Sequence, residues 1–247
     1  MVPQSLGNSK HKLPPGWVCD SCNHYFAIKV EKPVLDSDYF RHARHRNRII
    51  SKKGRIPPLE VVFGPNGEEL GMYVTPKGQR GIYALSEAAE SSWINHLFTK
   101  GGGSIYIVEP RKADRRDVSR LLTKVALEIF AFRLHHMIGW NDVIVDHRQL
   151  DEIRGYARFG VGMMWPFYER RIYSENKEWI SKTGESTEVL HEFDVLVTPW
   201  QEYFAIICIL GVEYVVNLGG AEIDGYVRWL NENESVSPLY SGRNASV

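Results

Sequence analysis

The alternation of apolar and polar residues along the chain predicts strands in two regions. Leu59–Phe63 and Leu70–Val74 flank a Gly-Pro-Asn-Gly turn, a pattern that favours a β-hairpin. Ser104–Val108 is strand-like and follows three consecutive glycines. The C-terminal half predicts an antiparallel meander over Val189–Thr198, Tyr203–Leu210 and Val212–Leu218, where Pro199 and Gly211 separate the runs.

Helical spacing of apolar residues is most extended from Asp117 to about His136. An apolar stripe along this segment is formed by Val118, Leu121, Leu122, Val125, Ile129, Phe132 and Leu134. Asp117 suits an N-cap and Gly139 a helix stop. Shorter helices are expected over Asp151–Phe159 and Ile223–Leu230. Helices and strands thus occur in separate runs, which predicts an α+β fold with an antiparallel sheet.

The first thirty residues have a different character, with turn formers before Trp17 and a short apolar run after Asn23 that Pro33 should end as a helix. A strongly basic stretch follows. We therefore expect a small metal-site module over residues 1–35 and a basic connector over 36–58. An α+β domain of unknown role should cover 59–235, and a flexible tail 236–247.

Composition restricts the class of protein without naming a partner. Hydrophobic residues make up 43% of the 247, enough for a substantial core, and the 30 Lys and Arg balance the 30 Asp and Glu. The three cysteines are too few for a disulfide framework, and the N-terminus lacks the pattern of a secretion signal. With no long uncharged apolar run, we expect a soluble, cytoplasmic protein without a membrane partner.

The pair Cys19 and Cys22 is the strongest chemical signal, because a two-residue gap lets two thiolates bind one tetrahedral metal ion. A structural zinc ion takes four ligands, so two are missing. His11 and His24 are nearby candidates, whereas Cys208 lies in a distant apolar run. A thioredoxin-like redox pair would need a preceding strand, and the prolines before Trp17 disfavour it. A chance pairing is the remaining alternative.

The surrounding residues carry a resemblance to a known family. Val2-Pro3-Gln4-Ser5-Leu6-Gly7-Asn8, followed by Trp17-Val18-Cys19-Asp20-Ser21-Cys22-Asn23, resembles the HNH endonucleases. The similar subgroup has a first C-x-x-C, then Glu/Asp-His-Ile/Met-x-Pro-x-Ser-Leu-Gly, then C-x-x-C-Asn. The resemblance implies a ββα-metal fold in which two CxxC knuckles bind a structural zinc ion. It also implies a histidine base that activates water, and a helix Asn or His that helps to hold a catalytic divalent cation.

Residue by residue, the match covers part of that pattern. Pro3, Ser5, Leu6 and Gly7 fit the segment after the base, Cys19 and Cys22 fit the second knuckle, and Asn23 fits the position on the helix that holds the catalytic metal. Asn8 and His11 are the candidates for the middle residue of the family name, at unusual distances. The base and the first CxxC would precede Met1, so the resemblance implies a truncated member. His24 or His11 is the candidate substitute for the base.

The basic segment is the candidate nucleic-acid contact. Its cations, in a stretch without acids, are Arg41, Arg44, Arg46, Arg48, Lys52, Lys53 and Arg55. Each phosphate that they neutralise would release counterions, so binding to DNA should depend on salt. A solvated face or a linker is the alternative interpretation.

Taken with the resemblance, these features predict an HNH-type metal-dependent endonuclease that hydrolyses phosphodiester bonds in DNA. Its cofactors would be a structural Zn²⁺ and a catalytic Mg²⁺ or other divalent cation. The chain as written would lack the base and two of the four thiolates. One alternative is a non-catalytic nucleic-acid-binding protein derived from such a nuclease. Another is a structural or partner-binding α+β protein with a chance CxxC.

Overall fold

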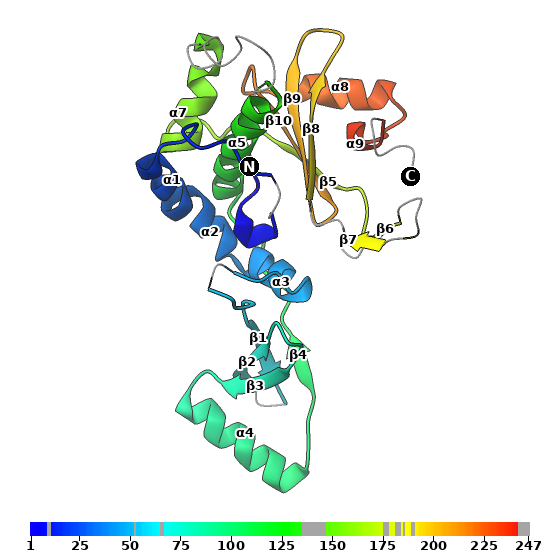
Figure 1. Cartoon of the computed structure of the whole chain (residues 1–247). Coiled ribbons are helices and arrows are strands. Elements are labelled where there is room, and N and C mark those ends of the chain that lie inside the picture. Colours follow the sequence, from blue (N-terminus) through cyan, green and yellow to red (C-terminus); the bar gives the residue numbers. More distant parts are fainter. Residues whose placement is uncertain are drawn as a thin grey trace. The chain divides into compact units, whose positions relative to one another are not determined.

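The computed structural model describes residues 1–8, 11–51, 53–64, 67–134, 147–174, 178–180, 184, 186–188 and 191–241. The chain divides into two compact units. Unit 1 comprises Met1–Pro3, Gly7–Val34 and Asp114–Val247, and unit 2 comprises Gln4–Leu6 and Leu35–Ala113. Each unit contains an antiparallel sheet of four strands together with helices, which confirms the predicted α+β fold with an antiparallel sheet (Figure 1).

Unit 1 is built around the sheet with strand order β5-β10-β9-β8. Its strands are β5 (Tyr168–Arg171), β8 (His191–Val197), β9 (Tyr203–Ile209) and β10 (Val212–Asn217), with a separate two-stranded sheet of β6 (Glu178–Ile180) and β7 (Ser186–Glu188). Its helical segments are α1 (Asp20–Phe26), η2 (Ala27–Glu31), α2 (Lys32–Leu35, whose last residue belongs to unit 2), α5 (Arg115–Leu134), η3 (Arg148–Leu150), α7 (Asp151–Phe159), α8 (Asp224–Glu232) and α9 (Pro238–Ser241).

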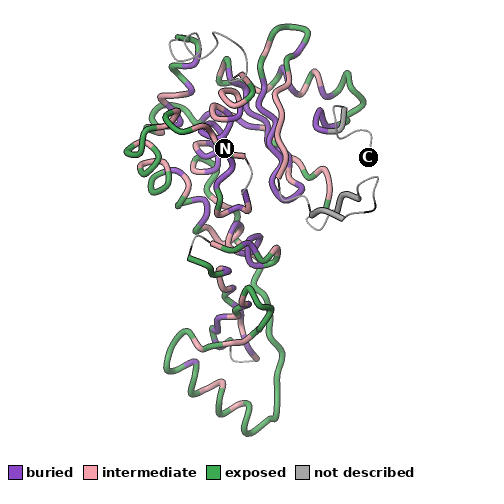
Figure 2. The backbone as a smooth tube through the Cα atoms, in the orientation of Figure 1, coloured by how far each residue is buried: buried purple, intermediate pink, exposed green. Residues whose placement is uncertain are grey.

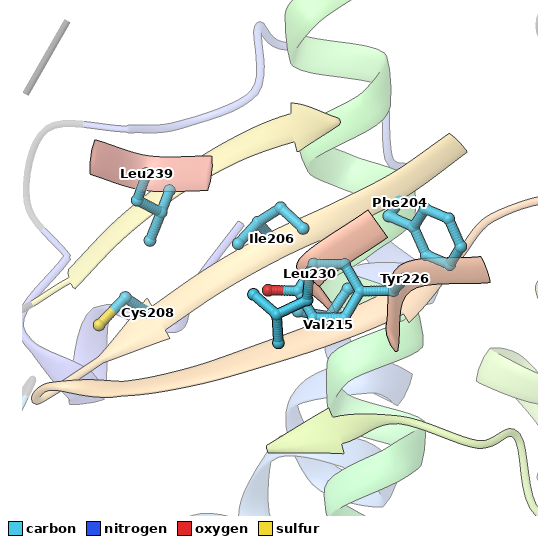
Figure 3. Packing of buried hydrophobic residues seen from close by; sticks show 7 residues of the cluster. All are labelled: Phe204, Ile206, Cys208, Val215, Tyr226, Leu230 and Leu239. Carbon is cyan, nitrogen blue, oxygen red and sulfur yellow. The ribbon is translucent and has the colours of Figure 1, made fainter. Parts of the chain in front are cut away.

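The core of unit 1 lies on both faces of β9, which explains why this strand is apolar without alternation. One face, with Phe204, Ile206 and Cys208, joins residues of β10, α8 and α9 in a buried cluster (Figure 3). Helix α5 packs against β8, β9 and β10. A two-residue turn joins β9 to β10, and its residues Leu210 and Gly211 have φ angles of 51° and 79°, as a type I′ hairpin turn requires.

The apolar stripe of α5 is buried as predicted, but its N-terminal cap differs. The Asp114 carboxylate accepts the amides of Arg116 at 2.8 Å and Asp117 at 3.1 Å, so Asp114 and not Asp117 caps the helix. The predicted last residues, 135 and 136, and Gly139 lie outside the described residues. Within the part of the chain that the structure describes, no helix is long and apolar enough to cross a membrane.

The helix expected after Asn23 begins earlier and ends later than predicted. The segments α1, η2 and α2 follow one another from Asp20 to Leu35, so Pro33 does not end the helical run. The reason is a π-helical turn just before the proline, where the Lys32 amide donates to the Ala27 carbonyl, five residues back. This change of register accommodates a residue that lacks an amide proton.

Unit 2 contains the predicted hairpin and several elements that the sequence pattern did not predict. Its sheet has the strand order β3-β2-β1-β4. The elements are η1 (Gln4–Leu6), α3 (Asp38–Arg46), β1 (Leu59–Phe63), β2 (Glu68–Val74), β3 (Arg80–Ala84), α4 (Glu87–Lys100) and β4 (Ile105–Ile107). Strands β1, β2 and β4 lie where strands were expected, whereas β3 and α4 are new. Helix α4 packs against β2 and β3, and Trp93 lies against the small core that the sheet provides.

The C-terminal segment contains an ordered part instead of the loose tail expected from residue 236. Figure 2 shows buried backbone in the region of α9, and Ser237 and Leu239 are among the buried residues. Leu239 belongs to the core cluster of unit 1 (Figure 3). The fully buried Glu213 carboxylate on β10 accepts hydrogen bonds from the Ser237 and Tyr226 hydroxyls and from the Arg170 guanidinium. These bonds hold the end of the chain against the sheet. Residues 242–247 lie outside the described part.

Candidate functional site

Cys19 and Cys22, the two cysteines of the CxxC, lie at the start of α1, in unit 1. Gly16 has a φ of 90°, a left-handed conformation that turns the chain before Trp17. Cys19 is the N-cap of α1, and its Sγ accepts the Cys22 amide at 3.3 Å. Its Sγ also lies 3.2 Å from the Ser21 hydroxyl. The CxxC therefore forms a tight turn in which amide and hydroxyl donors point at the first sulfur.

These donors favour the thiolate form of Cys19. Hydrogen bonds from Ser21 and Cys22 lower the pKa of this exposed thiol from 9.0 to about 7. The positive end of the helix dipole acts in the same direction. The second sulfur has a cationic partner, because Arg158 from the end of α7 donates to the Cys22 Sγ at 2.9 Å. Thiolates are the form that binds zinc, so Cys19 is suited to bind a metal ion near neutral pH.

Asn23 and His24 follow the pair on α1, and both are exposed. The Asn23 side chain is thus available to a ligand in solvent, as a metal-site residue would need to be. Its backbone amide donates to the Cys19 carbonyl at 2.9 Å. His11 lies elsewhere in unit 1, with its ring 5.0 Å from Phe193 and 6.3 Å from Phe132. The candidates Asn23 and His24 therefore adjoin the cysteines, and His11 sits in an aromatic cluster.

A complete metal site is not formed by the described residues. Among them, no group of three or more His, Cys, Asp and Glu side chains could hold a metal ion. Cys208 is buried in β9, and burial raises the pKa of its thiol to about 12, so it is neither near the pair nor ready to ionise. The donor chemistry of Cys19 and Cys22 fits two of the four ligands of a structural zinc ion.

The basic residues predicted to contact DNA have unequal exposure within unit 2. The Arg44 side chain is buried and donates to the Leu35 carbonyl at 3.4 Å, and Arg41 pairs with Glu60 at 3.0 Å. Lys52 lies outside the described residues. The exposed members are Arg46, Arg48, Lys53 and Arg55. The segment expected to be a connector instead contains the helix α3, whose His42 and His45 are also buried.

A cavity of about 580 Å³ beside α1 was not predicted from the sequence. Its apolar wall includes Trp17 and Phe26, together with residues of α5, and Arg154 and Arg158 of α7 line its polar side. Lys124 and Glu128 also line it. A signal was present in the sequence: α5 carries Leu127, Phe130 and Ala131 outside its main apolar stripe, so its hydrophobic surface is wider than one interface needs.

The histidine at the start of β8 gives a prediction about pH. Both ring nitrogens of His191 are buried and make no hydrogen bond to the residues described, and burial, with a smaller effect of His11, lowers its pKa from 6.5 to about 4. Between these values the unfolded chain binds more protons than the folded one. The free energy of unfolding should therefore fall as pH falls through this window, by at most about 3 kcal/mol.

Urea denaturation at a series of pH values measures this effect. His191→Phe should flatten the dependence between pH 6.5 and about 4, because it removes the titrating ring. His147→Phe, which replaces an exposed histidine, is the matched control. Equal pH dependence in the parent and the His191 variant would contradict the assignment.

Comparison of the chain with protein-family models, with curated proteins and with solved structures gave no match.

Proposed function

We propose that this chain is part of an HNH-type metal-dependent endonuclease that hydrolyses phosphodiester bonds in DNA. The observation that carries the proposal is the turn at the start of α1, where Cys19 accepts the Cys22 amide and has a pKa near 7. A redox pair would need a preceding strand, and here the chain reaches Cys19 through a turn at Gly16. Asn23 follows in an exposed position, which is the order of residues in the second knuckle of that family.

In this proposal the residues of α1 have separate roles. Cys19 and Cys22 supply two thiolates to a structural zinc ion, and Arg158 stabilises the negative charge on the Cys22 sulfur. Asn23 offers its side-chain oxygen to a divalent cation such as Mg²⁺, and that cation would stabilise charge on the scissile phosphate and its leaving oxygen. His24 is the histidine on α1 nearest to this position. The other two thiolates and the principal base would come from residues outside this sequence.

The exposed cations of unit 2 support a nucleic-acid substrate. Arg46, Arg48, Lys53 and Arg55 are exposed and carry charges that attract phosphates. Arg41 is half-buried and Arg44 is buried, so they contribute less to such a surface. DNA binding through these four residues should weaken as salt concentration rises.

A second candidate is a non-catalytic nucleic-acid-binding protein derived from such a nuclease. The described residues favour it in one respect, since they bring no third ligand to the cysteine pair. The two candidates share the basic surface and differ in hydrolysis.

Plasmid nicking distinguishes them. The coding DNA upstream of Met1 should contain an in-frame C-x-x-C followed by Glu/Asp-His, and protein expressed with that segment should nick supercoiled plasmid in the presence of Mg²⁺. Removal of the metal by a chelator should abolish nicking. Asn23→Ala should lower the nicking rate at least about tenfold, as loss of one catalytic contact does. Asn95→Ala, on the exposed side of α4, is the matched control and should retain the rate.

Zinc content tests the structural role on the same preparation. Cys19→Ser should reduce bound zinc, and Cys208→Ser, which removes a buried thiol, should not. Salt-sensitive DNA binding without nicking by the extended protein would support the second candidate. An in-frame stop codon directly upstream, together with absence of DNA binding, would contradict both.

A further inference from the structure

The loop after α7 exposes apolar side chains that no part of the proposed site uses. It runs from Phe159 to Met164 with the sequence Phe-Gly-Val-Gly-Met-Met. Phe159, Val161 and Met163 are 62%, 69% and 86% exposed. Three large apolar side chains at the tip of one short loop are unusual on a soluble surface and mark a contact with another molecule.

This loop is fixed by its neighbours in unit 1. The Arg116 guanidinium on α5 donates to the carbonyls of both Gly160 and Gly162 at 2.7 Å. Gly160 caps α7 with a φ of 66°, and a Cβ at this position would lie only 2.7 Å from the Arg120 side chain. The backbone therefore holds the apolar side chains outward instead of letting them fold onto the core, and insertion of the loop into a partner would cost little ordering entropy.

Two arginines of α5 lie beside the loop, and none of their hydrogen bonds to the described residues goes to a carboxylate. Arg116 bonds to the loop carbonyls, and Arg120 donates to the Arg158 carbonyl at 2.7 Å. Asp117 acts electrostatically on Arg120. The Arg158 guanidinium donates to the Cys22 thiol and therefore belongs to the cysteine pair. Two guanidinium groups beside an apolar tip fit a partner that has negative charges next to an apolar layer.

The loop also adjoins the candidate site. The Tyr25 hydroxyl on α1 donates to the Arg158 carbonyl at 2.6 Å, and Arg120 reaches the Lys29 carbonyl at 3.4 Å. Helix α7 lies beside α5 (Figure 1), so the loop at its end is tied to both α5 and α1. A molecule whose phosphates approach Asn23 would therefore have its adjacent part near Phe159.

We propose that the Phe159–Met164 loop is a wedge that inserts between base steps of duplex DNA, with Arg116 and Arg120 close to the flanking phosphates. This inference rests on the proposed function. Proteins that bend DNA insert Phe or Met side chains between base steps from the minor groove in this way. The free energy that unstacking costs is offset because the bent DNA contacts more protein surface. A lipid surface also has phosphates above an apolar layer, but the link of the loop to α1, where phosphodiester chemistry is proposed, favours DNA.

The wedge is tested with the 247-residue chain and a duplex that contains a fluorescent adenine analogue at a pyrimidine–purine step. Binding by the parent should raise the fluorescence, because the analogue becomes unstacked. The triple variant Phe159→Ser, Val161→Ser and Met163→Ser should lose this signal and bind DNA about tenfold more weakly or worse. The dependence of affinity on salt should not change, since the variant removes no cation. Phe98→Ser is the matched control, because Phe98 on α4 is 87% exposed and lies in unit 2.

The outcomes separate the wedge from the proposed function. If the parent binds DNA but the triple variant retains affinity and fluorescence, the wedge is wrong and the nuclease proposal stands. If the parent binds no DNA, the wedge fails, and plasmid nicking by the extended protein still decides the nuclease proposal. If the triple variant loses binding to vesicles of anionic phospholipid while its DNA binding is intact, the loop faces a membrane and the wedge is overturned. Circular dichroism of the variant should match the parent, because the three substituted side chains are exposed and contribute little to the core.

Discussion

Replacing Glu213 by glutamine is expected to lower the free energy of unfolding by about 3–5 kcal/mol. Its carboxylate is 0% exposed and accepts from the Arg170 guanidinium and the Tyr226 hydroxyl, each at 2.8 Å, and from the Ser237 hydroxyl. Glutamine would leave Arg170 without its counter-charge and would turn an amide group toward donors. The loss is large because the partners remain buried.

Urea denaturation measures the loss, and limited proteolysis should show earlier cleavage near the C-terminus, since Ser237 loses its acceptor. Glu169→Gln is the matched control. Its carboxylate on the neighbouring strand is 37% exposed and lies 3.6 Å from Arg115, so its removal should cost less than about 1 kcal/mol. A Glu213 variant as stable as this control would show that the buried network does not stabilise the fold.

Replacing Lys124 by methionine should destabilise the fold by a similar amount, but in this case negative charge is left without its cationic partner. The Lys124 ammonium on α5 lies 3.0 Å from Glu31 and 2.7 Å from Glu128, and the three side chains are 7%, 17% and 14% exposed. Without the Lys124 ammonium, the partly buried Glu31 and Glu128 carboxylates would lose their shared cation, and Glu128 would keep only the Met1 amino group, whose pKa burial lowers well below its usual value. We expect a loss of about 3–5 kcal/mol near neutral pH.

Urea denaturation near neutral pH measures the loss. Lys32→Met, which removes an exposed lysine on α2, should leave stability within about 0.5 kcal/mol of the parent. A Lys124 variant as stable as the Lys32 variant would show that this charged cluster does not stabilise the fold.

Segments with a strong hydrophobic signal were predicted nearly to the residue. The run Tyr203–Leu210 corresponds to β9, because a strand buried on both faces has no polar positions to blur the pattern. Asp151–Phe159 corresponds to α7, where a strongly one-sided apolar face meets a terminal glycine. In these segments, local preference and burial agree.

The missed elements lack that agreement. Strand β3 contains Gly81, and the Tyr73 ring of β2 covers this glycine so closely that a Cβ would lie 2.4 Å from its hydroxyl. A glycine weakens the strand signal, and the aromatic cover comes from another strand. In α4, only the small residue Ala89 is buried, so the larger apolar side chains of this helix do not form a single buried stripe. Both elements depend on tertiary contacts that local pattern does not encode.

The candidate site shows the same limit. The turn of Cys19 and Cys22 at the start of a helix could be inferred from the residues themselves. The Arg158 contact to Cys22 could not, because 136 positions separate them. The burial of Arg44 could not be predicted either, because a basic stretch indicates charge but does not indicate which arginine side chain of α3 is buried.

The interrupted sequence of unit 1 has a consequence for how the chain acquires its structure. Unit 2 forms almost entirely from one contiguous stretch, Leu35–Ala113, and its hairpins join near neighbours. Unit 1 must bring Glu31 to Lys124 across 93 positions. During synthesis the first helices therefore emerge long before α5, and their apolar sides stay unburied while unit 2 can already fold. Folding of unit 1 must overcome the entropy cost of closing a long loop, so it should be the later and slower event.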